Sequence, residues 1–320
     1  MLTYILFIIG LIFLIKGADH LVDGASSLAK KWHIPNIVIG LTIISFGTSL
    51  PELIVNIIAA TNGSTDIGIG TVIGSNISNI ALILGLTAVI YPIAVRKSTQ
   101  AKEIPYSILS ALILLVLISD KFFNSQATSL LTQIDGIIML IFFILFLLYT
   151  LNISMKHRRL NLEGEHVIKR KYSTVFFLML SGLIGLYFGG KWVVEGAVAI
   201  ANLFDLSEFV ISATIIAVGT SLPELATTLA AAYRKNLDMA VGNIIGSNIF
   251  NILLVLGITA MIRPMAAPLL ISVDILYLIG LSIILFAFLI IGKKYELERW
   301  QGASLLLIYI GYVTFIIIRG

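Results

Sequence analysis

Apolar stretches long enough to cross a lipid bilayer recur along almost the whole chain, separated by short polar segments. Apolar residues make up 58% of the sequence and charged residues 12%, whereas an average soluble domain has roughly 45–50% and about 25%. Polar side chains cannot cover so much apolar surface, so lipid is the expected solvent. Because a helix needs about 20 residues to cross ~30 Å of hydrocarbon, we predict an all-α polytopic membrane protein.

By this criterion the sequence contains ten transmembrane helices. We place them at residues 2–28, 36–60, 67–91, 104–119, 130–151, 173–200, 208–232, 239–262, 270–291 and 300–318. The first stretch lacks the early basic cluster and the cleavage site of a signal peptide, so we interpret it as a span. The chain contains no cysteine, which excludes disulfides and thiolate metal sites.

The sequence repeats itself with an offset of 172 residues. Residues 42–53 (TIISFGTSLPEL) and 214–225 (TIIAVGTSLPEL) agree at ten of twelve positions, and residues 73–79 (IGSNISN) and 245–251 (IGSNIFN) agree at six of seven. The chain is therefore expected to be a duplicated five-span unit. Because five is odd, the second unit enters the membrane from the opposite side, which gives two inverted five-helix repeats, a common plan for secondary transporters.

Lys and Arg are distributed unequally between the two sides of this arrangement. The loops after the odd-numbered spans hold 16 of the 21 basic residues, and the opposite side holds three. Since basic loops remain cytoplasmic, we expect a cell-membrane protein with both termini extracellular. Residues 1–151 then form the first repeat, residues 152–172 a cytoplasmic linker and residues 173–320 the second repeat. The net charge of +4 is explained by these loops, and we expect no nucleic-acid partner.

The two copies of GTSLPE place a proline and a glutamate near the middle of the second and seventh spans. Pro51 and Pro223 each remove a backbone donor, so a carbonyl of the preceding turn loses its helical partner. Glu52 and Glu224 are carboxylates where charge is costly, and such residues indicate a functional site. We expect both glutamates to line an ion site at mid-membrane.

Hydroxyl and amide side chains accompany these glutamates at helical spacing. Residues three or four positions apart share a helix face, and the following residues satisfy that spacing with a glutamate or with each other: Thr48, Ser49, Ser75, Asn79, Thr220, Ser221, Ser247 and Asn251. Their side-chain donor atoms are all oxygen, which suits hard cations such as Ca²⁺, Na⁺ or Mg²⁺.

Small residues also allow close helix packing in membranes. For Ser75 and Ser247, packing and ion ligation explain the sequence equally well. Packing is the favoured interpretation for Gly40, Gly70, Gly74, Gly242 and Gly246.

Charged residues also occur in the first and sixth spans. Asp19 aligns with Lys191 in the repeat, and Asp23 aligns with Glu195. We expect them to form ion pairs between helices, with the lining of a cytoplasmic access path as the alternative.

The doubled GTSLPE and GSNI-x-N motifs on two inverted halves resemble those of the sodium/calcium exchanger family, within the calcium:cation antiporters. The resemblance covers nearly the whole chain and implies a site where the two repeats meet. It implies that Glu52 and Glu224 are shared carboxylate ligands and that Thr48 and Thr220 offer carbonyl oxygens to Ca²⁺. The remaining residues that it implies, as sodium ligands or neighbours of the centre, are Ser45 and Ala217 (main-chain carbonyls), Ser49, Ser75, Asn79, Ser221, Ser247 and Asn251.

The resemblance further implies a secondary active antiporter that exchanges Na⁺ for Ca²⁺ by alternating access, with these ions as cargo and no cofactor. Some members carry Asp where this chain has Asn251, and the neutral amide favours electrogenic exchange without K⁺. The alternative is a Ca²⁺/H⁺ antiporter that uses the same two glutamates. A passive channel fits inverted repeats less well. The spans contain no HExxH or Gly-x-Gly-Asp sequence, so we expect no hydrolase and no enzyme activity.

Overall fold

The architecture is an all-helical bundle. The computed structural model describes residues 2–62, 65–119, 130–160, 170–203, 217–267 and 270–319. Within these ranges eight helices are long and apolar enough to cross a membrane, or nine if Asn36–Thr48 and Leu50–Ile58, which are bent by 40°, form one span. The predicted all-α membrane fold is confirmed. The predicted seventh span, residues 208–232, begins outside the described residues.

The long helices are α1 (Leu2–Trp32), α7 (Ile104–Ile118), α9 (Gln133–Leu160), α10 (Tyr172–Leu203), α16 (Ile271–Phe288) and α17 (Arg299–Arg319). Two spans combine an α-helix, a π-helical segment and a second α-helix. These are α5 (Thr65–Ile77), η2 (Ser78–Leu84) and α6 (Gly85–Ile90), and α14 (Leu237–Ile249), η5 (Phe250–Leu256) and α15 (Gly257–Ile262). The helix α9 continues to Leu160, into the segment that we assigned to the linker.

The second span is divided into α2 (Asn36–Ile39), a π-helical segment η1 (Gly40–Ile44), α3 (Ser45–Thr48) and α4 (Leu50–Asn62). The described part of the seventh comprises α12 (Ala217–Thr220) and α13 (Leu222–Tyr233). The fourth span begins earlier than predicted, because the π-helical segment η3 (Thr99–Glu103) precedes α7.

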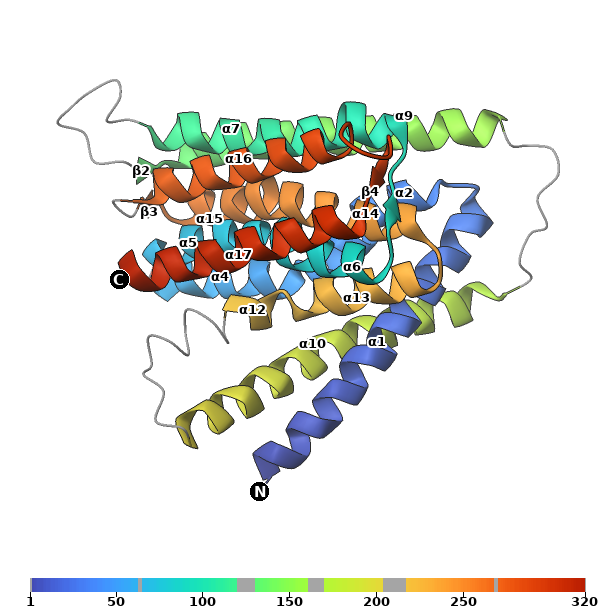
Figure 1. Cartoon of the computed structure of the whole chain (residues 1–320), viewed down its shortest axis with the longest axis horizontal. Helices are drawn as coiled ribbons and strands as arrows, with labels where there is room; N and C mark the ends of the chain where they lie inside the picture. The colour runs from blue at the N-terminus through green and yellow to red at the C-terminus, as the bar shows by residue number, and fades with distance from the viewer. Residues whose placement is uncertain are drawn as a thin grey trace.

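The α5–η2–α6 and α14–η5–α15 spans form the centre of the bundle. In their most apolar stretches 72% and 83% of the residues are buried, against 22% in α17 and 44% in α16. In Figure 1 α7, α9 and α16 cover one side of this centre, while α4 and α13 lie on the other side. The helices α1 and α10 cross each other obliquely at the edge of the bundle.

Two short antiparallel sheets join the repeats to each other. The strand β1 (Ile93–Ala94) pairs with β4 (Glu296–Leu297), and β2 (Leu130–Leu131) pairs with β3 (Met265–Ala266). The strands β2 and β3 lie at one end of the bundle and β4 lies at the other (Figure 1). Each repeat therefore gives one strand to each end, as an inverted duplication requires.

Glycines bring α1 and α10 into backbone contact. A Cβ atom on Gly17 would lie 2.7 Å from the Leu186 amide nitrogen, and one on Gly182 would lie 2.6 Å from the Leu21 amide nitrogen. The two helices run antiparallel, because Gly10 meets Gly189 near one end of the seam. Small residues allow this close approach in a membrane, where no hydrophobic effect drives helices together.

The charged residues of α1 and α10 lie at opposite ends of this antiparallel pair. Asp23 accepts a 2.7 Å bond from Arg170, and Asp19 pairs with Arg234 at 3.1 Å. The expected pairs between helices take a different form, because both arginines lie just outside a helix, Arg170 before α10 and Arg234 after α13. Lys191 and Glu195 pair with each other at 3.9 Å on α10. The antiparallel packing separates Lys191 and Glu195 from the aspartates. The alternative that these residues line a cytoplasmic access path stays a prediction.

Gly40, Gly242 and Gly246 are packing residues, as predicted. The same prediction is wrong for Gly70 and Gly74, because a Cβ atom on either would meet no described atom within 4 Å. A Cβ atom on Gly242 would lie 2.7 Å from the Ile37 carbonyl oxygen, and one on Gly40 would lie 2.6 Å from that of Met239. The same face of α14 meets Leu41 and the Ser45 hydroxyl at Gly246. This contact sets the distance between the second span and the central span of the other repeat.

We therefore expect Gly242→Ala to destabilise the protein by about 1–3 kcal/mol, since overpacking forces the backbones apart. Thermal unfolding in detergent should show a lower midpoint. Gly311→Ala is the matched control, because a Cβ atom there meets no described atom within 4 Å. Equal melting of the two variants would contradict this account of the contact.

Candidate functional site

Both proline motifs break their helices at the serine that precedes Leu-Pro. Ser49 has φ −86° and ψ 3°, and Ser221 has φ −89° and ψ 5°. Proline lacks the amide hydrogen that would bond to the carbonyl four residues earlier. The next helix begins directly after the break, with Glu52 or Glu224 in its first turn. The partial positive charge of a helix N-terminus favours a carboxylate there.

The structure brings the predicted side chains together inside the bundle. Glu52 and Glu224 are each 1% exposed. The other fully buried predicted residues are Ser45, Thr48, Ser49, Ser75, Asn79, Ser221, Ser247 and Asn251. Thr220 is partly buried, and Ala217, described here by its backbone, begins α12.

Hydrogen bonds connect the motif of the first repeat with residues of the second. The Ser49 hydroxyl donates to Glu224 Oε1 at 3.4 Å, and the hydroxyls of Thr48 and Ser247 lie 3.4 Å apart. Each contact joins residues more than 170 positions apart. The predicted meeting of the two motifs is therefore present.

Many oxygen atoms at this meeting point have no hydrogen-bond partner among the described residues. They are both carboxylate oxygens of Glu52, Glu224 Oε2, the hydroxyls of Ser75 and Ser221, and the amide oxygens of Asn79 and Asn251. Buried polar groups are normally paired, and an unpaired carboxylate in low dielectric is costly. Bound cations satisfy unpaired oxygens of this kind, so the arrangement fits cation binding by oxygen ligands.

The hydroxyl of Ser45 has a different role from the other serines. It donates to the main-chain oxygens of Gly40 at 2.7 Å and of Asn243 at 2.9 Å. The Ser45 carbonyl already accepts from the Ser49 amide at 2.9 Å. The same carbonyl also accepts from the Thr48 hydroxyl at 3.4 Å. Any ligation by Ser45 would therefore replace one of these two bonds, and its side chain joins the second span to α14.

Asn243 is a site residue that the sequence analysis did not identify. Its Oδ1 accepts from the Thr48 hydroxyl at 3.3 Å, and its Nδ2 donates to the Thr228 hydroxyl at 3.0 Å. Asn243 aligns with Thr71 in the first repeat, so comparison of the two repeats does not mark position 243 as a site residue. Asn76 and Asn248 were also missed, although the duplicated IGSN sequence contains both and could have indicated them.

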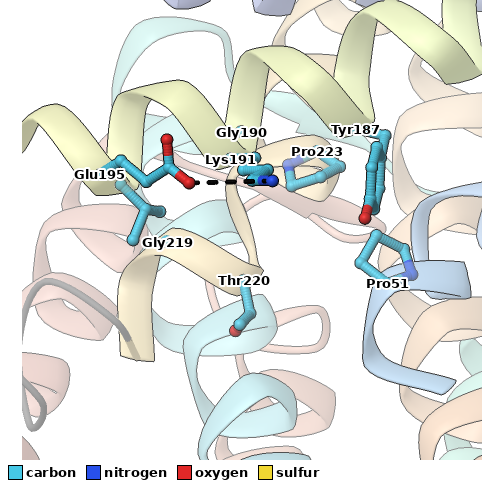
Figure 2. Close-up of a pocket in the computed structure, with 9 residues that line it drawn as sticks. Pro51, Tyr187, Gly190, Lys191, Glu195, Gly219, Thr220 and Pro223 are labelled. Atoms are coloured by element: carbon cyan, nitrogen blue, oxygen red, sulfur yellow. Dashed lines mark ion pairs between the residues drawn. The ribbon is translucent and has the colours of Figure 1, made fainter. Parts of the chain in front are cut away.

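A cavity of about 240 Å³ lies beside the two helix breaks. Pro51 and Pro223 line it, and so does Thr220, one of the predicted ligands. Figure 2 shows the half-exposed Lys191 and Glu195 side chains on α10 above the segment that carries Gly219 and Thr220. The cavity therefore gives space at the edge of the oxygen cluster rather than at its centre.

A metal centre built from three or more acidic, histidine or cysteine side chains is not found among the described residues. The cluster instead combines two carboxylates with hydroxyl and amide oxygens. This composition matches the prediction of an oxygen-only site for hard cations.

Comparison with known proteins decides the family. A family model described as sodium/calcium exchanger protein matches residues 2–152 and 174–318. The chain belongs to the sodium/calcium exchanger family. It is 38% identical to inner membrane protein YrbG of Escherichia coli, over 95% of this chain and 94% of YrbG. It is 30% identical to sodium/calcium exchanger MaX1 of Methanosarcina acetivorans, over 98% and 97%.

Solved structures of an exchanger share the fold. A structure of the sodium-calcium exchanger NCX_Mj soaked with zero Na⁺ and Ca²⁺ matches with a TM-score of 0.82 and 35% identity, over 98% of this chain and 99% of that one. Family members of this kind are integral membrane transporters of cations. The resemblance inferred from the two motifs is therefore confirmed.

We expect Glu52→Gln and Glu224→Gln each to abolish Ca²⁺ transport, because a desolvated divalent ion needs nearby negative charge. Uptake of ⁴⁵Ca²⁺ into proteoliposomes measures this, beside a thermal melt that verifies folding. Glu103→Gln is the control, since Glu103 is a comparably buried carboxylate that bonds instead to Tyr149 at 2.5 Å. It should retain Ca²⁺ transport. Near-normal uptake by either site variant would remove that glutamate from the site.

Proposed function

We propose that this exchanger is a secondary active antiporter that moves Na⁺ and Ca²⁺ in opposite directions across the cell membrane by alternating access. The observation that carries the proposal is the cluster of buried, unpaired oxygens that both repeats contribute. Ca²⁺ takes roughly 6–8 oxygen ligands, and the cluster offers carboxylates, hydroxyls and amides in one place. MaX1 and NCX_Mj, which are named as sodium/calcium exchangers, support the same pair of cargo ions.

In this proposal Glu52 and Glu224 bind the divalent ion and the neutral oxygens bind sodium. The two carboxylates give the centre a formal charge of −2, which one Ca²⁺ neutralises. The hydroxyls of Ser75 and Ser221 and the amide oxygens of Asn79 and Asn251 are buried and unpaired, so they are available to the monovalent ion. Ser49 and Ser247 touch the other repeat. Together with the main-chain carbonyls of Thr48, Thr220, Ser45 and Ala217 they complete the proposed set of ligands.

The inverted duplication supports alternating access. The Ser49–Glu224 and Thr48–Ser247 contacts both cross from one repeat to the other. A site shared by two related halves can open to either side when one half moves against the other, as in other inverted-repeat transporters.

Sodium-gradient-driven uptake of ⁴⁵Ca²⁺ tests the proposal. Proteoliposomes loaded with Na⁺ and diluted into sodium-free medium should accumulate Ca²⁺, and sodium on both sides should stop it. The second candidate, Ca²⁺/H⁺ exchange, rests on the unpaired oxygens of Glu52 and Glu224, which protons could occupy. Uptake driven by a pH gradient without sodium, with H⁺ flux proportional to Ca²⁺ flux, would select that alternative.

We also propose that the basic loops are cytoplasmic and both termini extracellular, with residues 152–172 on the cytoplasmic side between repeats 1–151 and 173–320. The chain has no cysteine, so a single introduced thiol reports its own side of the membrane. Arg263→Cys and Lys293→Cys suit this purpose, because both residues are exposed and lie next to β3 and β4 at opposite ends of the bundle. In intact cells a membrane-impermeant maleimide should label Arg263→Cys alone, and permeabilisation should expose Lys293→Cys. The reverse pattern would invert the topology.

We expect inside-negative voltage to speed Ca²⁺ extrusion, and K⁺ to be unnecessary. Family resemblance implies that more than two Na⁺ replace one Ca²⁺, so the sodium-loaded centre is net positive and enters the cell downhill. Each charge moved is worth about 2.3 kcal/mol per 100 mV. Exchange is measured in proteoliposomes with the potential set by valinomycin, and separately with K⁺ replaced by choline. Asn251→Asp should add a carboxylate and weaken or reverse the voltage dependence.

Voltage-independent exchange by the wild type would contradict electrogenic transport. An absolute need for K⁺ would show that the neutral Asn251 has been misinterpreted.

A further inference from the structure

Four asparagines form a closed network between the two central spans. Asn76 on α5 and Asn248 on α14 each donate from Nδ2 to the main-chain oxygen of the other, at 3.1 Å and 3.3 Å. Asn251 donates to Asn76 Oδ1 at 3.1 Å, and Asn79 donates to Asn248 Oδ1 at 2.9 Å. All four side chains are buried. The offset of 172 residues maps this network onto itself.

The network has one consistent direction. A main-chain oxygen only accepts hydrogen bonds, so Asn76 must turn its nitrogen toward Asn248 and its oxygen away. That oxygen faces the Asn251 side chain, which must then present its nitrogen. The same reasoning applies to the other half of the network. The Asn76 carbonyl requires the nitrogen of Asn248, so the Asn248 oxygen faces Asn79, which must present its own nitrogen. The two main-chain carbonyls therefore determine the orientation of all four amides, which geometry alone leaves ambiguous.

This orientation decides which atoms of Asn79 and Asn251 can bind a cation. With their nitrogens held by Asn76 and Asn248, Asn79 and Asn251 have their Oδ1 atoms free of any described partner and buried. An amide rotated by half a turn would offer N–H groups instead, which repel a cation. Asn76 and Asn248 have no unpaired buried side-chain atom of their own in the described structure. They can act on an ion through the other two amides.

We propose that Asn76 and Asn248 are positioning residues that aim the amide oxygens of Asn251 and Asn79 at the transported cation. This inference rests on the proposed function, because it assigns a role within the same site. The pairing is crossed: Asn76 of the first repeat orients Asn251 of the second, and Asn248 of the second orients Asn79 of the first.

The asparagine network lies where main-chain carbonyls need hydrogen-bond donors from side chains. The π-helical segments η2 and η5 begin just after Asn76 and Asn248. Where an α-helix changes to π-helical hydrogen bonding, the main-chain register shifts, and such places often occur at functional sites. In lipid every carbonyl at the shift needs a partner. The Asn76 and Asn248 amides supply one from the opposite repeat.

Double-mutant cycles on Ca²⁺ binding test the crossed pairing. Purified variants in detergent are titrated with ⁴⁵Ca²⁺, after a thermal melt confirms folding. Asn76→Ala should weaken binding about 10–100-fold, as loss of a residue that orients a ligand typically does. In an Asn251→Ala background the same change should have almost no further effect, because the oriented oxygen is already gone.

The matched control cycle combines Asn76→Ala with Asn79→Ala, whose losses should multiply. The symmetry-related cycles should reverse the pattern, with Asn248 coupled to Asn79 and additive with Asn251. Coupled residues depart from additivity, whereas independent ones do not. A general loss of packing would not produce this crossed pattern.

Equal coupling of Asn76 to both Asn79 and Asn251, or additivity in every cycle, would overturn the assignment while leaving the exchanger function intact. Failure of both Asn76→Ala and Asn248→Ala to fold would assign the network to stability and overturn it as well. Absence of Ca²⁺ binding by the wild type would instead overturn the proposed function, and with it this inference.

Discussion

Burial of two carboxylates among apolar helices is the constraint on which the rest of the structure depends. Glu52 and Glu224 are almost completely buried, and the ion pairs of the described residues involve other acids, such as Asp19 and Asp23. Two uncompensated charges in a low-dielectric interior are strongly unfavourable. Each carboxylate lies in the first turn of a helix, and Glu224 also accepts from the Ser49 hydroxyl. The broken helices, the crossed spans and the polar centre all follow from that requirement.

The duplication meets this requirement in a way that one repeat could not. Each half supplies one broken helix, one carboxylate and one π-containing central span. The contacts that complete the centre run between the halves, from Ser49 to Glu224 and from Asn76 to Asn251. The two small sheets also connect the halves, at the ends of the bundle, since each pairs a strand of one half with a strand of the other. A half separated from its partner would leave these polar groups exposed to lipid.

The periphery of the bundle is held by exposed ion pairs and close backbone packing, unlike the polar centre. Arg96 pairs with Asp238 at 2.5 Å, and Asp23 pairs with Arg170, with all four side chains at least 22% exposed. Solvent screens such pairs, so each contributes little to stability. Their position fits the basic loops that we place on the cytoplasmic side, where positive charge directs topology. The seam of glycines between α1 and α10 depends on close backbone packing instead.

The sequence by itself determined the membrane fold and the duplication, and it predicted most residues of the candidate site. Hydropathy and the offset of 172 residues depend on local composition, so they can be recognised without a structure. The spacing of Thr48, Ser49 and Glu52 put them on one helix face. It could not say what that face meets, because the partners of these residues lie on the other repeat.

The tertiary structure alone decided the relations between helices. Asn243 entered the site because α14 crosses the second span at that level, and no repeat marks it. The antiparallel packing of α1 and α10 separated Lys191 and Glu195 from the aspartates with which they align. The direction of the four asparagine amides depends on two main-chain carbonyls brought together by the crossing of α5 and α14. Sequence spacing specifies a helix face, whereas the neighbour of that face depends on helix crossing, which only the packed bundle determines.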